Sequence, residues 1–552
     1  MTLFCFSDGA VLLASMKRLL GCRSLVLFFF LEAETFRDQS ERHWSAALLD
    51  SVHLAARWPV PPHRLQSSSS MGPETKTQVP LRVFFFPLMS PGHMIPMIDV
   101  AKLFARHGAA TTIITTPANE PFARPAIDRA NSSSPPLPHP INLIFLPFPS
   151  SVHHLLPAGH ENFSSITSDD DFNKLFTALF ALDTPFGHLL QSHQPDCLVS
   201  DSVFTWSAAI SADLNIPRLI FHGPGIFTLC IHDNLNLHDA YGQATTFTIQ
   251  DIPHDIHMNR WEVPNIFTLP MWLQMLRDAE DRSYGVVVNS FYELEPDYAE
   301  LYRRKPGRRA WYIGPVSLYN ESADEKAVRG LAETEHEELT SWLDTKPAGS
   351  VVYVSFGSLC VFSVDQVEEI AAGLEISGHC FVWVVRDKGP STPEGFEERV
   401  KGRGVVVRGW VPQVVLLGHV AVGGFVNHCG WNSVLEGISA GLPMVTWPLM
   451  HEQFINEKLV NEVLGIGVTA RREGQDPTVV IGREEVAGAV RRLMDGGDEA
   501  EVRRGKAREY ARMARTAIED GGSSRVDLNR LMDELSQRRD VGGEEKVEFS
   551  SN

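Results

Sequence analysis

The sequence predicts an α/β protein with two doubly wound domains. Short apolar runs alternate with longer segments of helical periodicity, which is the pattern of parallel strands and the helices that connect them. The first such unit is a strand at 82–87 followed by a loop and a helix to about residue 106, and another starts with a strand at 422–426. A chain of 552 residues, 43% of them hydrophobic, can bury two cores of ordinary size.

Strand and helix segments follow one another through both halves of the chain. In the first half we expect further strands at 109–116, 141–147, 196–201, 216–222, 285–289 and 311–314, and helices at 172–190 and from about 203. In the second half we expect strands at 351–355, 381–386, 404–408, 444–447 and 465–470, and helices at 337–344, 431–439, 452–460, 483–494, 499–518 and 525–535. In open sheets of this kind, ligands bind beyond the carboxyl ends of the strands.

Changes in composition mark the boundaries of the domains. The apolar run at 24–31 is too short to span a bilayer, and Met71 stands shortly before the first strand, so we interpret the leader as disordered or as an extension of the gene model. The predicted parts are this leader at 1–78, a first domain at 79–315, a polar linker at 316–334, a second domain at 335–520, a final helix at 521–537 and a charged tail at 538–552 that we expect to be disordered.

Two turns in the second half have the residues of an anion site. The strand at 422–426 runs into Asn427-His428-Cys429-Gly430, and a helix starts near Trp431. The free N–H groups and the positive end of the helix dipole favour a phosphate at such a point. Ser358 follows the strand at 351–355 directly after a glycine, which lets the backbone approach a phosphate closely.

The stretch from Trp410 to Gln453 carries a longer signal. It reads WVPQVVLLGHVAVGGFVNHCGWNSVLEGISAGLPMVTWPLMHEQ. Over its full length it resembles the signature box of plant secondary-product glycosyltransferases, the plant family 1 UDP-glycosyltransferases. Members of that family bind a UDP-sugar and have the GT-B fold, in which two Rossmann-like domains face each other across a cleft and a C-terminal helix crosses back to the N-terminal domain. The resemblance implies this fold here, with the donor in the second domain and the acceptor in the first.

The resemblance implies a role for individual residues of the box. Trp410 would stack on the uracil ring, Gln413 would bond to it, and Glu436 would accept the ribose hydroxyls. Taken singly, Trp410 is more often a core residue and Glu436 a surface residue, but all positions match together. The closing Gln453 favours UDP-glucose over UDP-galactose. The remaining implied donor-site residues are His428, Asn432 and Ser433 at the diphosphate, Trp431 and Glu452 at the sugar, and Ser358, Val411 and Gly430.

His93 and Asp201 are the candidate catalytic residues. His93 lies on the loop after the first strand, where the resemblance implies a general base that deprotonates the acceptor hydroxyl; the pKa of imidazole suits that task. A single loop histidine is usually a surface residue, but the Pro-Gly-His-Met-Ile-Pro context is typical of the family. Asp201 ends the strand at 196–201 and would pair with the histidine. An aspartate there can also cap the next helix, and both roles remain open.

The acceptor side is the least defined part of the sequence. We expect loops and short helices at 223–275 to line the acceptor pocket, with Phe227, His232 and Trp261 as candidates for its wall. Residues 250–254 differ from the Pro-Gly-Leu-Pro-like stretch of close family members, which leaves the acceptor class open. The amino-acid sequences of the motifs resemble those of the subgroup that acts on flavonoids, triterpenes, steroids and hormones.

Composition narrows the class of partner. A net charge of −19 argues against nucleic acid, and local dipoles must attract the donor instead. Seven cysteines without a CxxC pair favour a reducing cytosol. We therefore expect a cytoplasmic monomer without membrane insertion, metal site or cofactor, in which UDP-glucose is a co-substrate.

The expected activity is inverting transfer of glucose to a hydroxyl of a small plant metabolite, which gives a β-O-glucoside. Alternatives are another UDP-sugar donor or a non-catalytic UDP-sugar-binding homologue. A sugar-nucleotide epimerase would need a GxxGxxG opening, which the first strand lacks.

Overall fold

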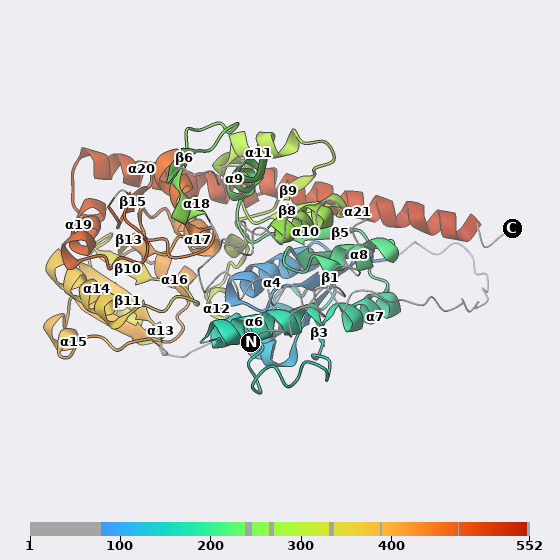
Figure 1. Cartoon of the computed structure of the whole chain (residues 1–552), viewed down its shortest axis with the longest axis horizontal. Helices are drawn as coiled ribbons and strands as arrows, with labels where there is room; N and C mark the ends of the chain where they lie inside the picture. Colours follow the sequence, from blue (N-terminus) through green and yellow to red (C-terminus); the bar gives the residue numbers. More distant parts are fainter. Residues whose placement is uncertain are drawn as a thin grey trace, which may run out of the picture.

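Two α/β domains lie side by side in the computed structural model (Figure 1). The structure describes residues 79–548, with gaps at 167, 238–244, 264–269, 330–335, 387–388 and 473. The predicted leader at 1–78 and the last four residues lie outside the described residues.

The first domain has a seven-stranded sheet of order β3-β2-β1-β4-β5-β8-β9, and all neighbouring strands in it are parallel. Its strands are β1 (Arg82–Phe86), β2 (Ala110–Thr115), β3 (Asn142–Phe145), β4 (Cys197–Asp201), β5 (Arg218–Phe221), β8 (Gly285–Val288) and β9 (Ala310–Tyr312). Its helices are α4 (Pro91–Arg106), α5 (Glu120–Asn131), α6 (Asp169–Phe180), α7 (Asp183–His193), α8 (Trp206–Asp213), α9 (Ile226–Leu237), α10 (Pro270–Asp281) and α11 (Pro296–Arg303).

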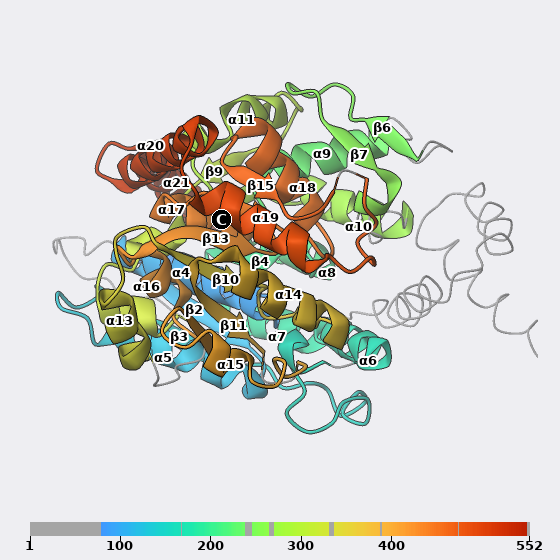
Figure 2. The ribbon, with the colours of Figure 1, turned by 90° about the vertical axis from the view of Figure 1, so that its left-hand side faces the viewer.

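The second domain has a six-stranded parallel sheet of order β12-β11-β10-β13-β14-β15. Its strands are β10 (Val351–Ser355), β11 (Cys380–Val385), β12 (Gly404–Arg408), β13 (Val422–Asn427), β14 (Met444–Thr446) and β15 (Gly467–Thr469). Its helices are α13 (His336–Asp344), α14 (Val364–Ser377), α15 (Phe396–Arg399), α16 (Gln413–Leu417), α17 (Trp431–Ala440), α18 (Gln453–Lys458), α19 (Arg483–Met494) and α20 (Asp498–Ile518). Figure 2 looks onto this domain, with α14 and α19 next to each other.

Two predicted elements of the first domain were wrong in detail. The single helix expected at 172–190 is two helices, because Pro185 lacks the N–H that a helix continuing from α6 would need. The irregular region expected at 223–275 contains the twelve-residue helix α9 and a hairpin of β6 (Thr246–Thr248) and β7 (His257–Asn259). Helix α9 is buried on several sides, so it shows no clear alternation of apolar and polar faces.

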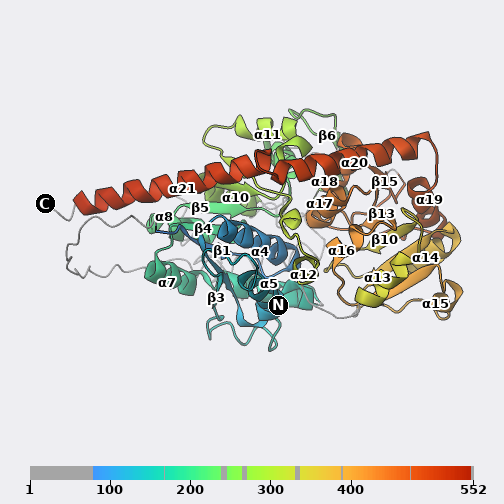
Figure 3. The same cartoon turned by 180° about the vertical axis from the view of Figure 1, so that it is seen from behind.

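The C-terminal segment crosses from the second domain to the first (Figure 3). Helix α21 (Ser523–Glu548) buries Leu528, Leu531 and Leu535 in the core of the first domain. It continues past the end expected at 537, and its helical residues reach to 548 where a disordered tail was expected. The guanidinium of Arg539 donates to the carbonyl of Val79 (2.7 Å), which fixes a segment that looks only charged in the sequence.

Each sheet has a point at which the strand order reverses. In the first sheet β1 lies beside β4, and the chain leaves these two strands in opposite directions to β2 and β5. In the second sheet β10 lies beside β13 in the same way. Loops that follow such neighbouring strands diverge and leave a crevice, where ligands bind. The predicted two-domain α/β fold is confirmed, and its crevices hold the candidate site.

Candidate active site

His93 and Asp201 form a hydrogen-bonded pair at the first crevice. His93 is the third residue of α4, which follows β1, and Asp201 ends the neighbouring strand β4. The imidazole Nδ1 lies 2.7 Å from Oδ2 of Asp201. The carboxylate is fully buried, whereas the histidine side chain remains 29% exposed. A proton on Nδ1 donated to the carboxylate leaves the lone pair of Nε2 available to an incoming group.

Backbone groups hold the carboxylate of Asp201 in place. Its Oδ2 accepts from the N–H of Leu88 (3.4 Å) and its Oδ1 from the N–H of Val203 (3.1 Å). The aspartate thus holds the turn after β4 as well as the histidine. It is not a helix N-cap, because α8 begins only at Trp206 rather than near residue 203.

The electrostatic surroundings raise the pKa of His93 above its ordinary value of 6.5. Burial lowers this pKa, but the charge of Asp201, its hydrogen bond and the charge of Glu452 more than offset that effect. These interactions favour the imidazolium that forms when the histidine accepts a proton. The pair can therefore act as a general base whose protonated form is stabilised.

The N-terminus of α17 faces the same cleft from the second domain. Gly430 is the N-cap residue, and within the described residues no side chain caps this helix and no carboxylate lies in its first turn. The N–H groups of the first turn have no partner inside a helix, so they are available to an anion. The loop between β13 and α17 is held by Asn427, whose Oδ1 accepts from the N–H of Cys429 (2.8 Å) at a positive φ of 61°.

The ring of His428 fits between two glycines. A Cβ on Gly357 would lie 2.5 Å from Cε1 and Nε2 of this ring, and a Cβ on Gly430 would lie 2.5 Å from Nε2. Nδ1 of His428 is buried and has no hydrogen-bond partner among the described residues. A buried polar atom without a partner is costly, and an oxygen-rich ligand could satisfy it.

Replacing Gly357 with alanine is expected to weaken UDP binding about tenfold or more. Gly357 has a φ of +75°, so alanine adds backbone strain of about 1–2 kcal/mol and also displaces the His428 ring. Gly378→Ala is the matched control, because Gly378 has a φ of +83° with nothing within 4 Å of its added Cβ. Titration calorimetry with UDP measures both, and equal affinities for the two variants would contradict the role of His428.

Burial lowers the pKa of His428 from 6.5 to about 4. The unfolded chain therefore binds more protons than the folded one between these values, so this histidine's contribution to the free energy of unfolding is lost as the pH falls through that window. We expect the stability advantage of the ligand-free wild type over His428→Asn to shrink by about 2.5 kcal/mol between pH 7.5 and 4.5. Urea unfolding at both pH values measures it, and a pH-independent difference would contradict this account.

Gln413, Glu436 and Trp410 are part of one hydrogen-bonded network in the cleft. Nε2 of Gln413 donates to Oε2 of Glu436 (2.8 Å) and to the hydroxyl of Ser433 (3.2 Å). Glu436 is only 8% exposed, and its Oε1 accepts from the guanidinium of Arg329 (2.8 Å). The indole Nε1 of Trp410 donates to the carbonyl of Arg329 (3.3 Å).

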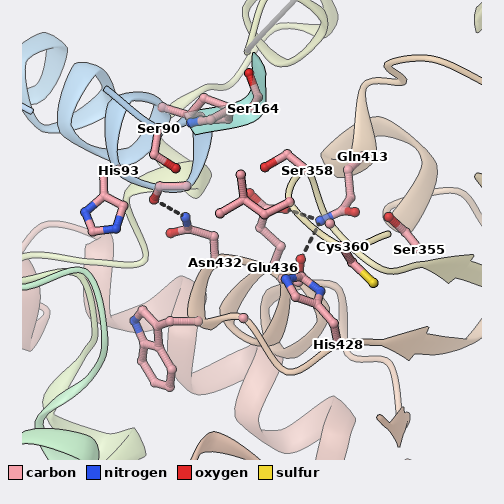
Figure 4. A pocket seen from close by; sticks show the side chains of 18 of the residues that line it. Ser90, His93, Ser164, Ser355, Ser358, Cys360, Gln413, His428, Asn432 and Glu436 are labelled. Atoms are coloured by element: carbon pink, nitrogen blue, oxygen red, sulfur yellow. Dashed lines mark hydrogen bonds between the residues drawn. The ribbon is translucent and has the colours of Figure 1, made fainter. Parts of the chain in front are cut away.

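The two sets of residues line one cleft of about 570 Å³. Figure 4 shows His93 on one side of it and Ser358, Gln413 and His428 on the other. Every donor-site residue expected from the sequence lines this cleft, as does His93, and Asp201 lies directly behind His93. The expected members on the donor side are Ser358, Trp410, Val411, Gln413, His428, Gly430, Trp431, Asn432, Ser433, Glu436, Glu452 and Gln453.

Comparisons with known proteins identify the family of the chain. The family model described as "UDP-glucoronosyl and UDP-glucosyl transferase" matches residues 310–496. A UDP-glucose flavonoid 3-O-glucosyltransferase of Fragaria ananassa is 43% identical over 84% of this chain and 98% of its own length. The chain belongs to the UDP-glycosyltransferase family. A scopoletin glucosyltransferase of Nicotiana tabacum is also 43% identical, over 84% of this chain and 99% of its own length.

Solved structures support the same family. A Glycyrrhiza uralensis UGT in complex with glycyrrhetinic acid 3-O-monoglucuronide has a TM-score of 0.78 at 37% identity, over 86% of this chain and all of that one. A Phytolacca americana UGT in complex with a fluorinated UDP-glucose and pterostilbene has a TM-score of 0.65 at 28% identity, over 83% of this chain and all of that one. This UDP-glycosyltransferase thus has the predicted GT-B fold.

One residue that lines the cleft, Trp431, also joins the two domains of this UDP-glycosyltransferase. Trp431 was expected to face the sugar, but it is 3% exposed, and its indole Nε1 donates to the carbonyl of Asn289 in the first domain (2.8 Å). The side chain of Trp431 therefore contributes to the domain interface, and its backbone forms the first residue of α17. The reason is packing, because a large apolar ring next to Gly225 fills the space between the domains.

Of the region 223–275 expected to form the acceptor wall, Gly223 and Pro224 line the cleft, but the three residues named as candidates do not. Phe227 is fully buried in the core and His232 nearly so, because both lie on the buried helix α9. Trp261 packs edge-on against Phe454. None of the three belongs to the described lining of the cleft, which on the first-domain side includes Ile95, Phe122, Ser164, Ser165 and His222.

Contacts between the domains close the cleft at several points that the sequence did not reveal. Nδ2 of Asn432 donates to the carbonyl of Gly92 (2.6 Å), next to His93. The guanidinium of Arg386 donates to the carbonyl of Ser164 (3.2 Å) at another part of the cleft. Signals for such pairs are absent from the sequence because the partners are more than 200 residues apart.

Two further features of the transferase concern metal ligands and membrane-spanning helices. Among the described residues, no group of three or more His, Cys, Asp or Glu side chains could hold a metal ion. Within the same residues, no helix combines the length and apolar character needed to cross a bilayer.

Proposed function

We propose that this UDP-glycosyltransferase transfers glucose from UDP-glucose to a hydroxyl group of a small apolar plant metabolite and inverts the anomeric configuration. The observation that carries the proposal is the His93–Asp201 pair, 2.7 Å apart, in the same cleft as the N-terminus of α17. The pair supplies a base and the helix supplies an anion site. A protein that only binds a UDP-sugar needs the anion site but has no use for the base.

The proposed reaction is a single displacement. The acceptor hydroxyl lies at Nε2 of His93, its oxygen forms a bond to the anomeric carbon of glucose, and the bond from that carbon to the UDP oxygen breaks on the opposite face. The hydroxyl proton passes to Nε2, and Asp201 stabilises the resulting imidazolium. The product is a β-O-glucoside and the leaving group is UDP.

Negative charge grows on the diphosphate as its bond to glucose breaks. The first-turn N–H groups of α17, the ring of His428 and the hydroxyl of Ser358 would donate hydrogen bonds to that group, and all of them line the cleft. Preorganised donors of this kind stabilise a transition state strongly, because they need no rearrangement when the charge appears. We assign the diphosphate to these residues and the nucleoside to Trp410 and Glu436.

Gln453 is the residue that we assign to the choice of sugar. Its side-chain oxygen accepts from the N–H groups of Leu449 (2.9 Å) and Met450 (3.1 Å), which leaves its amide nitrogen to present to a sugar hydroxyl. The amide nitrogen of Gln453 would donate to one glucose hydroxyl, and the neighbouring carboxylate of Glu452 would accept from another.

The acceptor class follows from the relatives and from the cleft. The relatives carry names for flavonoid, scopoletin, anthocyanin and abscisate glucosyltransferases. These are small, mostly ring-containing molecules with a free hydroxyl or carboxyl group. The described first-domain lining contains Ile95 and Phe122 beside the serines, which suits an apolar acceptor with few polar groups.

The proposal extends to the setting of the enzyme. We place it in the cytoplasm as a monomer that needs no bound cofactor, with UDP-glucose as co-substrate. The described cysteines, Cys197, Cys230, Cys360, Cys380 and Cys429, are all free thiols, which supports a reducing compartment.

An acceptor panel with UDP-glucose tests the proposal. Flavonoids, coumarins, triterpenoids and abscisate are incubated with the full chain, products are detected by mass, and the anomeric proton coupling in the NMR spectrum gives the configuration. A β-linked glucoside is expected from at least one phenolic or alcohol acceptor. UDP binding without transfer to any of them would support a non-catalytic homologue, and an α-linked product would contradict the single displacement.

A further inference from the structure

One arginine in the polar segment between the domains reaches into the nucleoside end of the cleft. Arg329 is 8% exposed and follows the short helix α12 (Ala323–Ala327). Its Nη1 donates to Oε1 of Glu436 (2.8 Å), and its carbonyl accepts from Nε1 of Trp410 (3.3 Å). The side chain and the backbone of one residue therefore contact both groups assigned to the nucleoside.

The same guanidinium is bound to the helix that carries His93. Nε of Arg329 donates to Oδ2 of Asp99 on α4 (2.8 Å). Oδ1 of Asp99 accepts from Nδ2 of Asn320 (3.0 Å) and from Nζ of Lys102 (3.5 Å), and Lys102 also donates to Oδ1 of Asn320. All of these side chains are nearly inaccessible to solvent, so water cannot replace a lost partner at low cost.

The charges in this group alternate along a chain of contacts from one domain to the other. Lys102 and Asp99 belong to the first domain, Arg329 to the connecting segment and Glu436 to the second domain. Burial lowers the pKa of Arg329, but the charges of Asp99 and Glu436 raise it by more than burial lowers it. The pKa is therefore above its ordinary value, and the guanidinium stays charged. Neither carboxylate has another arginine in the described contacts.

We propose that Arg329 is a positioning residue that orients Glu436 and Trp410 for the nucleoside and ties their geometry to helix α4. The inference rests on the proposed function, since it assigns the ribose to Glu436. Arg329 itself does not need to touch the nucleotide. It holds one carboxylate oxygen so that the remaining lone pairs point to the ribose hydroxyls.

Lysine cannot fully replace Arg329. The guanidinium donates to Asp99 through Nε and to Glu436 through Nη1, in a fixed planar arrangement, whereas an ammonium group is a single point that cannot span both partners. Arg329→Met removes the charge while keeping a side chain of similar length. In this variant Oε1 of Glu436 loses its partner, and of the described contacts only the bond from Gln413 to Oε2 still holds the carboxylate.

The test compares the affinities of the full chain for UDP and for 2′,3′-dideoxy-UDP. In the wild type, hydrogen bonds from the ribose hydroxyls to a carboxylate are expected to make UDP bind about 10- to 100-fold more tightly. In Arg329→Met this ratio is expected to fall to about threefold or less, with an intermediate ratio in Arg329→Lys. A merely structural role would lower both affinities together and leave the ratio unchanged.

Arg106→Gln is the matched control. Arg106 lies on α4 and, like Arg329, joins that helix to the connecting segment, through Glu325 and the carbonyl of Tyr319, but it has no described contact with Glu436 or Trp410. We expect this variant to lose stability and to keep the wild-type ratio. Glu436→Gln should reduce the ratio by itself, and adding Arg329→Met to it should have no further effect.

The outcomes distinguish a failure of the proposed function from a failure of the role of Arg329. A wild-type chain that does not bind UDP would overturn the proposed function and this inference with it. A wild type that prefers UDP strongly, together with an Arg329→Met or Arg329→Lys variant that keeps the full preference, would overturn only the role of Arg329. Kinetics add a second readout, because the inference requires the KM for UDP-glucose to rise while the KM for the acceptor stays the same.

Discussion

Replacing His93 with glutamine is expected to lower kcat about 10²- to 10⁴-fold while UDP affinity changes less than threefold. Glutamine keeps a polar side chain of similar length but cannot take up the proton of the acceptor hydroxyl. General base catalysis typically contributes a rate factor of about 10²–10⁴, and this contribution would be lost. Asp201 Oδ2 can still accept from the glutamine amide, so its buried charge keeps a partner. Steady-state kinetics with a saturating acceptor measures kcat, and titration calorimetry measures UDP binding.

The control for this variant is another histidine–carboxylate pair. His379 Nε2 lies 2.8 Å from Oδ1 of Asp495, away from the cleft lining. His379→Gln removes a pair of the same type and is expected to leave kcat within about twofold of the wild type. Full activity of His93→Gln would show that another group removes the proton.

Replacing Asp201 with asparagine is expected to lower kcat/KM about 10²- to 10⁴-fold and to change its pH dependence. The asparagine amide can donate to Nδ1 of His93, which places the ring proton on Nε2 and removes the lone pair that accepts the acceptor proton. The charge of Asp201 also raises the pKa of His93, so its loss should lower that pKa.

The sign of the pH effect follows from the base being active only when neutral. In the wild type, kcat/KM should fall as the pH drops through the pKa of His93, which lies above 6.5. In Asp201→Asn the residual activity should persist to lower pH. A pH–rate profile of both proteins measures the shift, and an unchanged acidic limb would contradict the assignment of Asp201.

The sequence predicts the parts of the site that lie close together along the chain. The strand, the loop with His428 and the start of α17 are contiguous, and the pattern of residues 410–453 specifies them together. His93 and Asp201 are 108 residues apart, but each directly follows or ends a predicted strand, and the rule for parallel sheets brings such positions to one edge.

The rest depends on contacts that have no local signal. Arg329 lies in a segment whose polar composition predicts a linker, and its partners Asp99 and Glu436 are 230 and 107 residues away. The resemblance implies Trp431 at the sugar, but nothing in the sequence indicates that its indole also donates to the carbonyl of Asn289 in the first domain. The end of α21 could not be predicted because Gly542 and Gly543 disfavour a helix, and because Arg539 donates to the carbonyl of Val79, a residue 460 positions away.

The apolar cluster around α9 has a consequence for how the molecule holds together. It joins Ile231 and Leu235 of the first domain to Leu435 and Ile455 of the second in one continuous core. Moving the two lobes fully apart would expose this surface to water, at a cost comparable to partial unfolding. We therefore expect the two domains to unfold together in one cooperative transition.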